Sequence, residues 1–307
     1  MKIFLNEYIH PTAVEKLKDY AEIVTDFKNV EEIDAIILRT TNVSREIIEK
    51  ASNLKVIGKH GVGYDTIDIN AAKEYGVKVV YTPKSNVQSV AELIVALMTN
   101  VARNTSIAFE KVKKSEVKMV APKEMVGVEL QRKTLGLVGM GNIALAATDI
   151  LKNGYRMDVV GYDPFVSEER YQQLGIKKYE SLEEMLGEAD FINISVPLTE
   201  STRNMIDLEK LKCCKPNAII VNTARGGVIN EEDLYFALKT GVIRAAASDV
   251  FIQEPPTAEN PLTQLENFVA TPHLGACTEE AMIRMGMTVV DEVLAVLKGE
   301  EPQYLVV

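Results

Sequence analysis

The chain has 307 residues, of which 47% are apolar and 25% are charged, so its length and composition indicate about two globular domains. Its formal net charge of −10 argues against a nucleic-acid partner and against an anionic membrane surface, because phosphate groups bind to basic faces. No apolar run approaches the ~18 residues of a membrane-spanning helix, and the first residues predict a strand instead of a signal peptide, so we expect a cytoplasmic protein.

Strands and helices alternate through the first third of the chain. Apolar runs predict strands over Lys2–Leu5, Glu22–Thr25, Ala35–Leu38, Lys55–Ile57 and Lys78–Val80. Amphipathic segments between them predict helices over Thr12–Tyr20, Ser44–Ala51 and Ile69–Glu74. This alternation indicates a parallel sheet with helices on both faces.

A long helix and an irregular segment follow. The capping box Ser89–Glu92 predicts a helix that begins at Ser89 and continues to about Ala102. From Arg103 to Lys133 the apolar periodicity is poor and the charges are mixed, so we expect an extended arm. An arm of this kind is suited to contacts within a homodimer or a higher homo-oligomer.

A second alternating unit begins at Thr134. Its predicted strands are Thr134–Val138, Asp158–Tyr162, Phe191–Ser195, Ala218–Asn222, Arg244–Ser248 and Phe268–Ala270. Thr278 caps a final helix that runs to Lys298 and returns the chain to the first domain. We therefore predict a first domain of residues 1–98 and 285–307 and a second of residues 99–284, both doubly wound.

A glycine-rich turn opens the second unit. Gly139, Gly141 and Ala144 form a G-x-G-x-x-A pattern between a predicted strand and a helix that ends at Gly154. These small residues permit a tight turn, close approach of a pyrophosphate and close helix packing. Asp163 lies 19 residues after Ala144, at the end of the next strand, where an acid binds ribose hydroxyls. This succession of strand, glycine turn, helix, strand and acidic residue predicts a dinucleotide-binding site. The alternative is an ordinary turn whose glycines only relieve crowding.

A similar turn occurs in the first domain. Lys59 and His60 precede Gly61, Val62 and Gly63, directly after a predicted strand. Successive backbone N–H groups on such a turn bind anions. We expect this turn to hold a substrate carboxylate; the alternative is a turn without a ligand.

Three polar side chains that follow predicted strands of the second unit, with Glu254 in a proline-stiffened loop, have the chemistry for carbonyl reduction. Arg225, beside two glycines, suits a carboxylate. His273 suits proton transfer at neutral pH, and Glu254 is a carboxylate able to orient it. The alternatives are a surface arginine and a packed histidine. The three cysteines have no metal-ligand spacing, so we expect reduced, mostly buried thiols and no metal site.

These motifs together resemble the D-isomer-specific 2-hydroxyacid dehydrogenases, and among them the short D-3-phosphoglycerate dehydrogenases. The resemblance covers nearly the whole chain. It rests on Gly61–Gly63 with Asp65 and Asp68, Asn86 with Ser89–Leu93, Leu137–Ala144, Tyr162–Pro164, Val196–Thr199, Asn222–Gly227, Asp249–Glu254 and Thr271–Ala276.

The resemblance implies an α/β fold of two Rossmann-like doubly wound parallel-sheet domains, with the active site in the cleft between them. It implies NAD as cofactor and a small D-2-hydroxy acid or its 2-keto acid as substrate. Arg225 would bind the substrate, His273 would be the acid/base and Glu254 its partner. The substrate-binding set is Lys59, His60, Gly61, Val62, Gly63 and Asn86. The cofactor-binding set is Gly139, Gly141, Asn142, Ile143, Asp163, Val196, Pro197, Thr202, Thr223, Ala224, Asp249 and Gly275.

Some residues depart from the family pattern. Lys59 and His60 stand where phosphoglycerate dehydrogenases have Arg and Ala, and Asn142 stands where an Arg is frequent. No basic residue follows Asp163 closely to bind a 2′-phosphate, which favours NAD over NADP. The alternatives to a phosphoglycerate dehydrogenase are a glyoxylate or hydroxypyruvate reductase, or a dehydrogenase of another D-2-hydroxy acid, including a sulfonated one. A more distant alternative is a non-catalytic NADH-sensing protein similar to corepressors of this fold.

Overall fold

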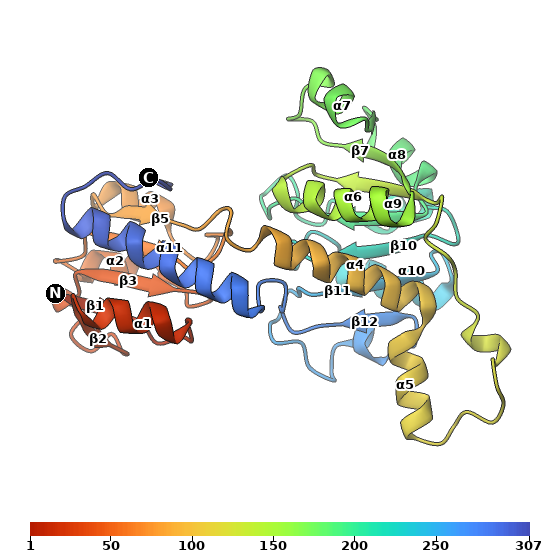
Figure 1. Cartoon of the computed structure of the whole chain (residues 1–307), viewed down its shortest axis with the longest axis horizontal. Helices are drawn as coiled ribbons and strands as arrows, with labels where there is room; N and C mark the ends of the chain where they lie inside the picture. The colour runs from red at the N-terminus through yellow and green to blue at the C-terminus, as the bar shows by residue number, and fades with distance from the viewer. The chain divides into compact units, whose positions relative to one another are not determined.

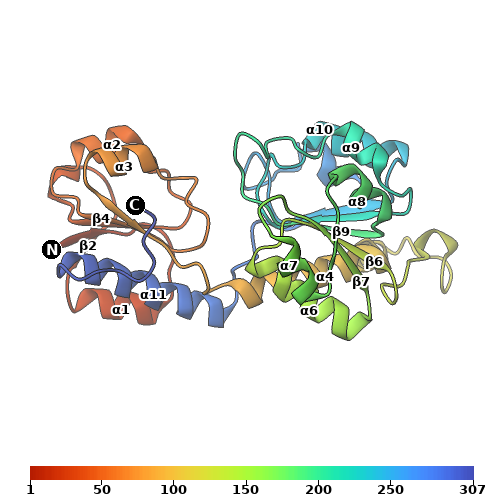
Figure 2. The same ribbon diagram turned by 90° about the horizontal axis from the view of Figure 1, so that it is seen from above.

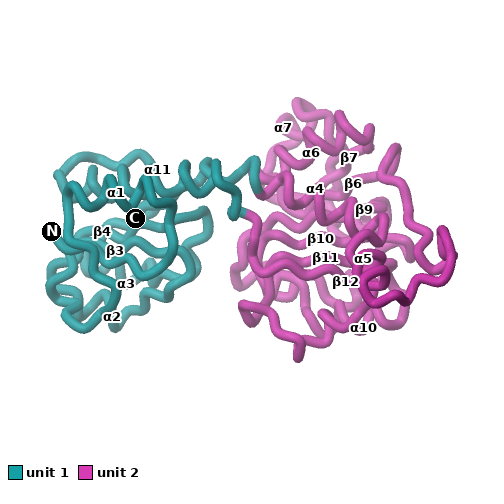
Figure 3. The backbone as a smooth tube through the Cα atoms, turned by 60° about the horizontal axis from the view of Figure 1, so that its bottom comes forward, with its two compact units in different colours: residues 1–89, 276–307 teal, residues 90–275 magenta.

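The computed structural model describes residues 1–307 and divides into two compact units (Figure 3). Unit 1 comprises Met1–Ser89 and Ala276–Val307, and unit 2 comprises Val90–Gly275. Both boundaries lie nine residues before the predicted ones: the buried residues of the first long helix pack on the core of unit 2 from Val90 onward, and the whole of the last helix, Glu279–Leu297, belongs to unit 1. Each unit contains one parallel sheet, of five and seven strands, which confirms the predicted fold class. None of the helices has the length and apolar composition required to cross a membrane.

The sheet of unit 1 has the strand order β2-β1-β3-β4-β5. Its strands are β1 (Lys2–Phe4), β2 (Glu22–Val24), β3 (Ala35–Leu38), β4 (Val56–Lys59) and β5 (Lys78–Val80). The helical segments of this unit are α1 (Pro11–Lys18), η1 (Val30–Glu32), α2 (Arg45–Lys50), α3 (Ile69–Glu74) and α11 (Glu279–Leu297).

Alternate strand residues of unit 1 fill two apolar layers, one on each face of the sheet. Ile3, Ile37 and Val56 pack with α1 and α11, whereas Ile36 and Ile57 pack with α2 and α3. Figure 2 shows these two pairs of helices on opposite faces. The C-terminal segment also belongs to this unit, because the main chain of Val306 and Val307 hydrogen-bonds to Val79 on β5.

The sheet of unit 2 has the strand order β12-β11-β10-β9-β6-β7-β8. Its strands are β6 (Thr134–Val138), β7 (Asp158–Tyr162), β8 (Lys177–Lys178), β9 (Phe191–Ile194), β10 (Ile219–Asn222), β11 (Ala245–Ser248) and β12 (Phe268–Ala270). The strand order reverses between β6 and β9, which is the place where open α/β sheets bind ligands.

Helices cover both faces of this sheet (Figures 1 and 2). Its helical segments are α4 (Val87–Arg103), α5 (Thr105–Lys113), η2 (Lys123–Met125), α6 (Asn142–Tyr155), α7 (Glu168–Leu174), α8 (Leu182–Glu188), α9 (Leu208–Cys213), α10 (Glu231–Thr240) and η3 (Pro261–Gln264). Buried residues of α8, α9 and α10 form one apolar layer, and those of α4 and α6 form the other.

Three predicted features differ in the structure. Ser89 does not cap α4, because the helix begins at Val87 and Ser89 lies inside its first turn. Gly154 does not end α6, which continues to Tyr155 and ends where Arg156 adopts a left-handed conformation with φ 56°. The predicted extended arm contains the helix α5 and the 3-10 turn η2, whose weak amphipathicity hid them.

Candidate active site

The glycine turn of unit 2 joins β6 to α6. Gly139 has a φ of 88°, and a Cβ there would lie 2.6 Å from the carbonyl oxygen of Ser195, so only glycine fits. Gly141, by contrast, faces open space, with nothing within 4 Å of a Cβ built on it. No side chain caps the start of α6, so the backbone N–H groups there are available to phosphate oxygens, and the turn fits a dinucleotide.

Asp163 lies at the end of β7, beside the glycine turn. One carboxylate oxygen accepts a hydrogen bond from the N–H of Met140 at 2.9 Å, and the other accepts from the N–H of Phe165 at 3.0 Å. A carboxylate has about four lone-pair sites. Two therefore remain available for other donors, and the binding of ribose hydroxyls by Asp163 stays a prediction.

The loop after β9 borders the same edge of the sheet, since β9 pairs with β6. The hydroxyl of Thr202 closes this loop: it donates to the carbonyl oxygen of Pro197 at 2.6 Å and accepts the N–H of Thr199 at 2.7 Å. Val196 and Pro197 thus lie in a fixed turn. The predicted cofactor residues of β6, β7 and β9 are therefore gathered where the strand order reverses.

Arg225 lies in a tight loop after β10. The Asn222 side chain shapes this loop by accepting from the N–H of Ala224 and donating to the carbonyl oxygen of Arg225, each at 3.0 Å. The guanidinium of Arg225 donates to the carbonyl oxygen of Ala224 at 2.7 Å. Gly226 lies against the next loop, where a Cβ would be only 2.0 Å from the carbonyl carbon of Phe251.

His273 and Glu254 form the predicted pair. Nδ1 of His273 lies 2.8 Å from one carboxylate oxygen of Glu254, and the other oxygen accepts the N–H of Phe251 at 3.0 Å. Burial raises the pKa of Glu254, but the hydrogen bonds from His273 and Phe251 and the charges of His273 and Arg225 outweigh it and lower the pKa. The carboxylate is therefore ionised beside the ring.

Asp249 holds the turn that carries His273. Its carboxylate, in a residue only 1% exposed, accepts from the hydroxyl of Thr271 at 2.5 Å and from the N–H groups of Leu274 at 2.7 Å and Gly275 at 2.8 Å. His273 itself has a φ of 56°, a conformation uncommon for residues with a side chain. The sequence placed Asp249 and Gly275 beside the cofactor; the structure shows that they shape this turn.

Unit 1 also gathers polar side chains at the carboxyl edge of its sheet. His60, after β4, is 3% exposed, and neither of its ring nitrogens has a hydrogen-bond partner. Asn86, after β5, is 8% exposed, and its Oδ1 has none. Burial, and secondarily the charge of Arg39, lowers the pKa of His60 to about 4, so its ring is neutral at pH 7. Unpaired buried polar atoms are rare, and these two lie where ligands bind parallel sheets.

The glycine turn of unit 1 is only partly available to an anion. The N–H of Gly61 already donates to the hydroxyl of Thr82 and to the carbonyl oxygen of Lys59, each at 3.0 Å. The N–H groups of Val62 and Gly63 have no such acceptor. Of the three N–H groups that the sequence suggested for binding an anion, only those of Val62 and Gly63 are therefore available.

Lys59 is 5% exposed, and its side chain is bound to neighbouring loops of unit 1. Its ammonium group donates to the carbonyl oxygen of Arg39 at 2.5 Å and to the hydroxyl of Thr66 at 3.0 Å. Glu7 fixes the same segment, because its carboxylate accepts the N–H groups of residues 39–41 and the hydroxyl of Thr40. Burial raises the pKa of Glu7, but these hydrogen bonds lower it to about 2. Nothing in the sequence pattern indicated Glu7 or Arg39.

The cysteines are reduced but not mostly buried. Cys214 is buried, whereas Cys213 and Cys277 are exposed. Cys277 accepts a hydrogen bond from the guanidinium of Arg39 at 3.3 Å. The expectation of mostly buried thiols was therefore wrong for Cys213, whereas the sequence already favoured partial exposure of Cys277.

Known proteins are similar to this chain in sequence and fold. Residues 95–275 match the family model described as "D-isomer specific 2-hydroxyacid dehydrogenase, NAD binding domain". A D-3-phosphoglycerate dehydrogenase of Methanocaldococcus jannaschii is 41% identical over 98% of this chain, which spans only 58% of that relative's length. A hydroxypyruvate reductase of Thermotoga maritima is 40% identical, over 95% of this chain and 97% of the relative.

A solved structure gives the same result for the fold. The TT0316 protein of Thermus thermophilus superposes with a TM-score of 0.93 and 33% identity, and the match covers 100% of both chains. The relatives named above identify the family. The glycine turn with Asp163 and the His273–Glu254 pair are consistent with that family. The chain belongs to the D-isomer specific 2-hydroxyacid dehydrogenases and carries the NAD binding domain of that family.

Proposed function

We propose that the protein is an NAD-dependent oxidoreductase that interconverts a small D-2-hydroxy acid and its 2-keto acid. The observation that carries the proposal is the 2.8 Å contact between His273 and Glu254, at the carboxyl edge of the sheet that bears the dinucleotide turn. Arg225 belongs to the same edge, and its charge acts on Glu254. An acid/base, its carboxylate partner and a cation for the substrate are thus held by one unit.

The cofactor would be held by the glycine turn and by Asp163. The open space at Gly141 and the uncapped start of α6 would receive the pyrophosphate. Asn142 and Ile143 open that helix, and the ribose would meet the carboxylate of Asp163. When bound, NAD would supply or accept the hydride.

The chain's own residues would handle the acid and the proton. The planar guanidinium of Arg225 would bind the substrate carboxylate through paired hydrogen bonds. His273, its Nδ1 held by Glu254, would donate a proton from Nε2 to the keto oxygen during reduction and take it back during oxidation. The ionised Glu254 would stabilise the protonated ring.

The substrate contacts of unit 1 are part of the same proposal. The N–H groups of Val62 and Gly63 would meet the substrate, as would the ring nitrogens of His60 and Oδ1 of Asn86. Our best assignment is a D-3-phosphoglycerate dehydrogenase, with a glyoxylate or hydroxypyruvate reductase as the alternative. Lys59 contributes little to this choice, because its ammonium group already binds Arg39 and Thr66.

A substrate panel tests the proposal. NADH oxidation would be measured with phosphohydroxypyruvate, hydroxypyruvate, glyoxylate and pyruvate. Preference for the phosphorylated acid supports the first assignment, and a preference for hydroxypyruvate or glyoxylate supports the alternative. Absence of turnover with every acid, despite tight NADH binding, would favour the NADH-sensing protein.

We also propose a homodimer or a higher homo-oligomer built on the arm that follows α4. Apolar side chains of this arm are exposed: Phe109, Val112, Met119, Val120 and Val126. An exposed apolar surface of this kind is typical of an interface. Sedimentation of the wild type and of Phe109→Asp would test the assignment, since the charge should shift the protein toward the monomer. We retain a cytoplasmic location as a prediction.

A further inference from the structure

Glu231, the first residue of α10, joins both ends of the loop that carries Glu254. One carboxylate oxygen accepts the N–H of Ile252 at 2.7 Å, and the other accepts the side-chain amide of Asn260 at 3.0 Å. The residues between these two contacts are mostly exposed. Packing therefore contributes little to the shape of this loop, and the hydrogen bonds of Glu231 are its main attachment to α10.

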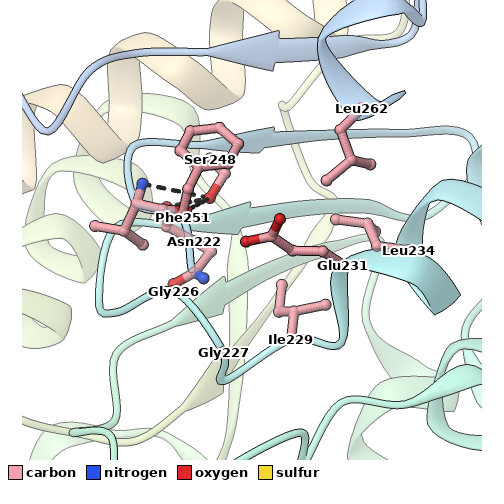
Figure 4. A pocket seen from close by; sticks show the side chains of 10 residues that line it. Asn222, Gly226, Gly227, Ile229, Glu231, Leu234, Ser248, Phe251 and Leu262 are labelled. Atoms are coloured by element: carbon pink, nitrogen blue, oxygen red, sulfur yellow. Dashed lines mark hydrogen bonds between the residues drawn. The ribbon is translucent and has the colours of Figure 1, made fainter. Parts of the chain in front are cut away.

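The helix does not require this carboxylate as its cap. Oδ1 of Asn230 already accepts the N–H groups of Glu232 and Asp233, each at 3.1 Å. Glu231 is thus available for the loop, and Figure 4 shows its carboxylate turned toward the side of the pocket formed by Phe251 and Asn222.

Two carboxylates share the same short stretch of backbone. Glu254 accepts the N–H of Phe251 at 3.0 Å, and Glu231 accepts the next N–H, that of Ile252, at 2.7 Å. The backbone of Gly226 also lies against this peptide. The position of the peptide therefore decides where the Glu254 carboxylate lies.

We propose that Glu231 is a positioning residue for the His273–Glu254 pair. It fixes the loop so that one oxygen of Glu254 stays on the N–H of Phe251 while the other meets Nδ1 of His273. The inference rests on the proposed function, because it matters only where this pair transfers a proton.

The test compares Glu231→Ala and Glu231→Gln with Glu232→Ala. Glu232 is exposed in the same turn of the same helix, and its carboxylate makes no hydrogen bond or ion pair with the loop, so it is a matched control for the loss of charge. We expect Glu231→Ala to lower kcat by roughly 10²-fold, the usual effect of a misplaced catalytic group, with NADH binding unchanged. Glu231→Gln should recover most of the activity, because its carbonyl oxygen still accepts the N–H of Ile252.

The pH profile separates positioning from a general structural effect. Contacts with His273, Arg225 and the N–H of Phe251 lower the pKa of Glu254 against the effect of burial. Weakening them should raise that pKa, so the acidic limb of kcat/KM should move to higher pH in Glu231→Ala. If the substitution only destabilised the protein, less enzyme would be folded, but the acidic limb of kcat/KM would stay at the same pH.

The outcomes are distinct. Equal kcat in Glu231→Ala and Glu232→Ala would overturn the inference, as would a loss of activity with an unmoved acidic limb. His273→Ala, measured in parallel, separates the two proposals: if it retains wild-type turnover, the proposed function fails and the inference with it. If His273→Ala is impaired and Glu231→Ala is not, only the inference fails.

Discussion

Gly226 is the position at which the smallest substitution should have the largest effect. In Gly226→Ala the new methyl group would lie 2.0 Å from the carbonyl carbon of Phe251, 2.1 Å from its oxygen and 2.5 Å from the nitrogen of Ile252. Ordinary carbon contacts are about 3.5 Å, so the two backbone segments must separate by roughly 1.5 Å. No side-chain rotamer can relieve the clash, because all three atoms belong to the main chain.

Separating these two backbone segments would displace both Arg225 and Glu254. Gly226 follows Arg225 directly, and Phe251 anchors the carboxylate of Glu254. A displacement of about 1 Å in a catalytic group commonly costs 10²-fold in rate, so we expect a loss in kcat/KM of that order. Overpacking should also lower the free energy of unfolding by about 1–3 kcal/mol.

Steady-state kinetics, NADH titration and urea unfolding would measure these effects. Gly154→Ala is the matched control: nothing lies within 4 Å of its new methyl group, and it is inside α6. It should keep full activity and gain about 0.5–1 kcal/mol of stability, the usual difference between glycine and alanine in a helix. Wild-type kcat/KM and stability in Gly226→Ala would refute the close approach of these loops.

Three other substitutions test the site. His273→Ala should lower turnover by about 10²–10⁴-fold, the range for loss of an acid/base, with NADH binding kept; loss of NADH binding would mean that the residue has another role. Asp163→Ala should weaken the preference for NADH over NADPH, measured as the ratio of the two kcat/KM values, and an unchanged ratio would contradict the ribose assignment. His60→Gln should reduce acid sensitivity: the pKa of His60 falls from 6.5 to about 4 on folding, so the wild type loses stability as the pH falls through this window. Equal pH dependence of urea unfolding in both proteins would show that His60 is not buried as a neutral ring.

The sheets could be predicted because their strands are buried apolar runs bounded by turns. Both faces of each sheet are covered, so a central strand such as Ala35–Leu38 has no polar residue to obscure it. β8 escaped prediction because it consists of two lysines at the edge of the sheet. The start of α4 was misplaced because Ser89–Glu92 has the pattern of a capping box, although the helix begins upstream.

The candidate site could be predicted only in part. Residue type and strand-end position indicated His273 and Glu254, which the structure places in contact. The supporting contacts could not be predicted, because they join residues far apart in sequence without a motif. Asp249 binds the turn of His273, and Glu231 resembles an ordinary acidic residue at the start of a helix until its partners are known.

Four buried side chains have polar atoms without hydrogen-bond partners. His60, Asn86, Tyr171 and Asn193 all have such atoms, so this property alone does not identify a ligand site. His60 and Asn86 differ from the other two because each follows the carboxyl end of one of two adjacent strands of unit 1, β4 and β5. A ligand there would meet His60 as a neutral ring, since its pKa is about 4, and would find the ammonium group of Lys59 already engaged. We therefore expect neutral hydrogen bonding by His60, and not the charge of Lys59, to be the feature of unit 1 that distinguishes among 2-keto acids.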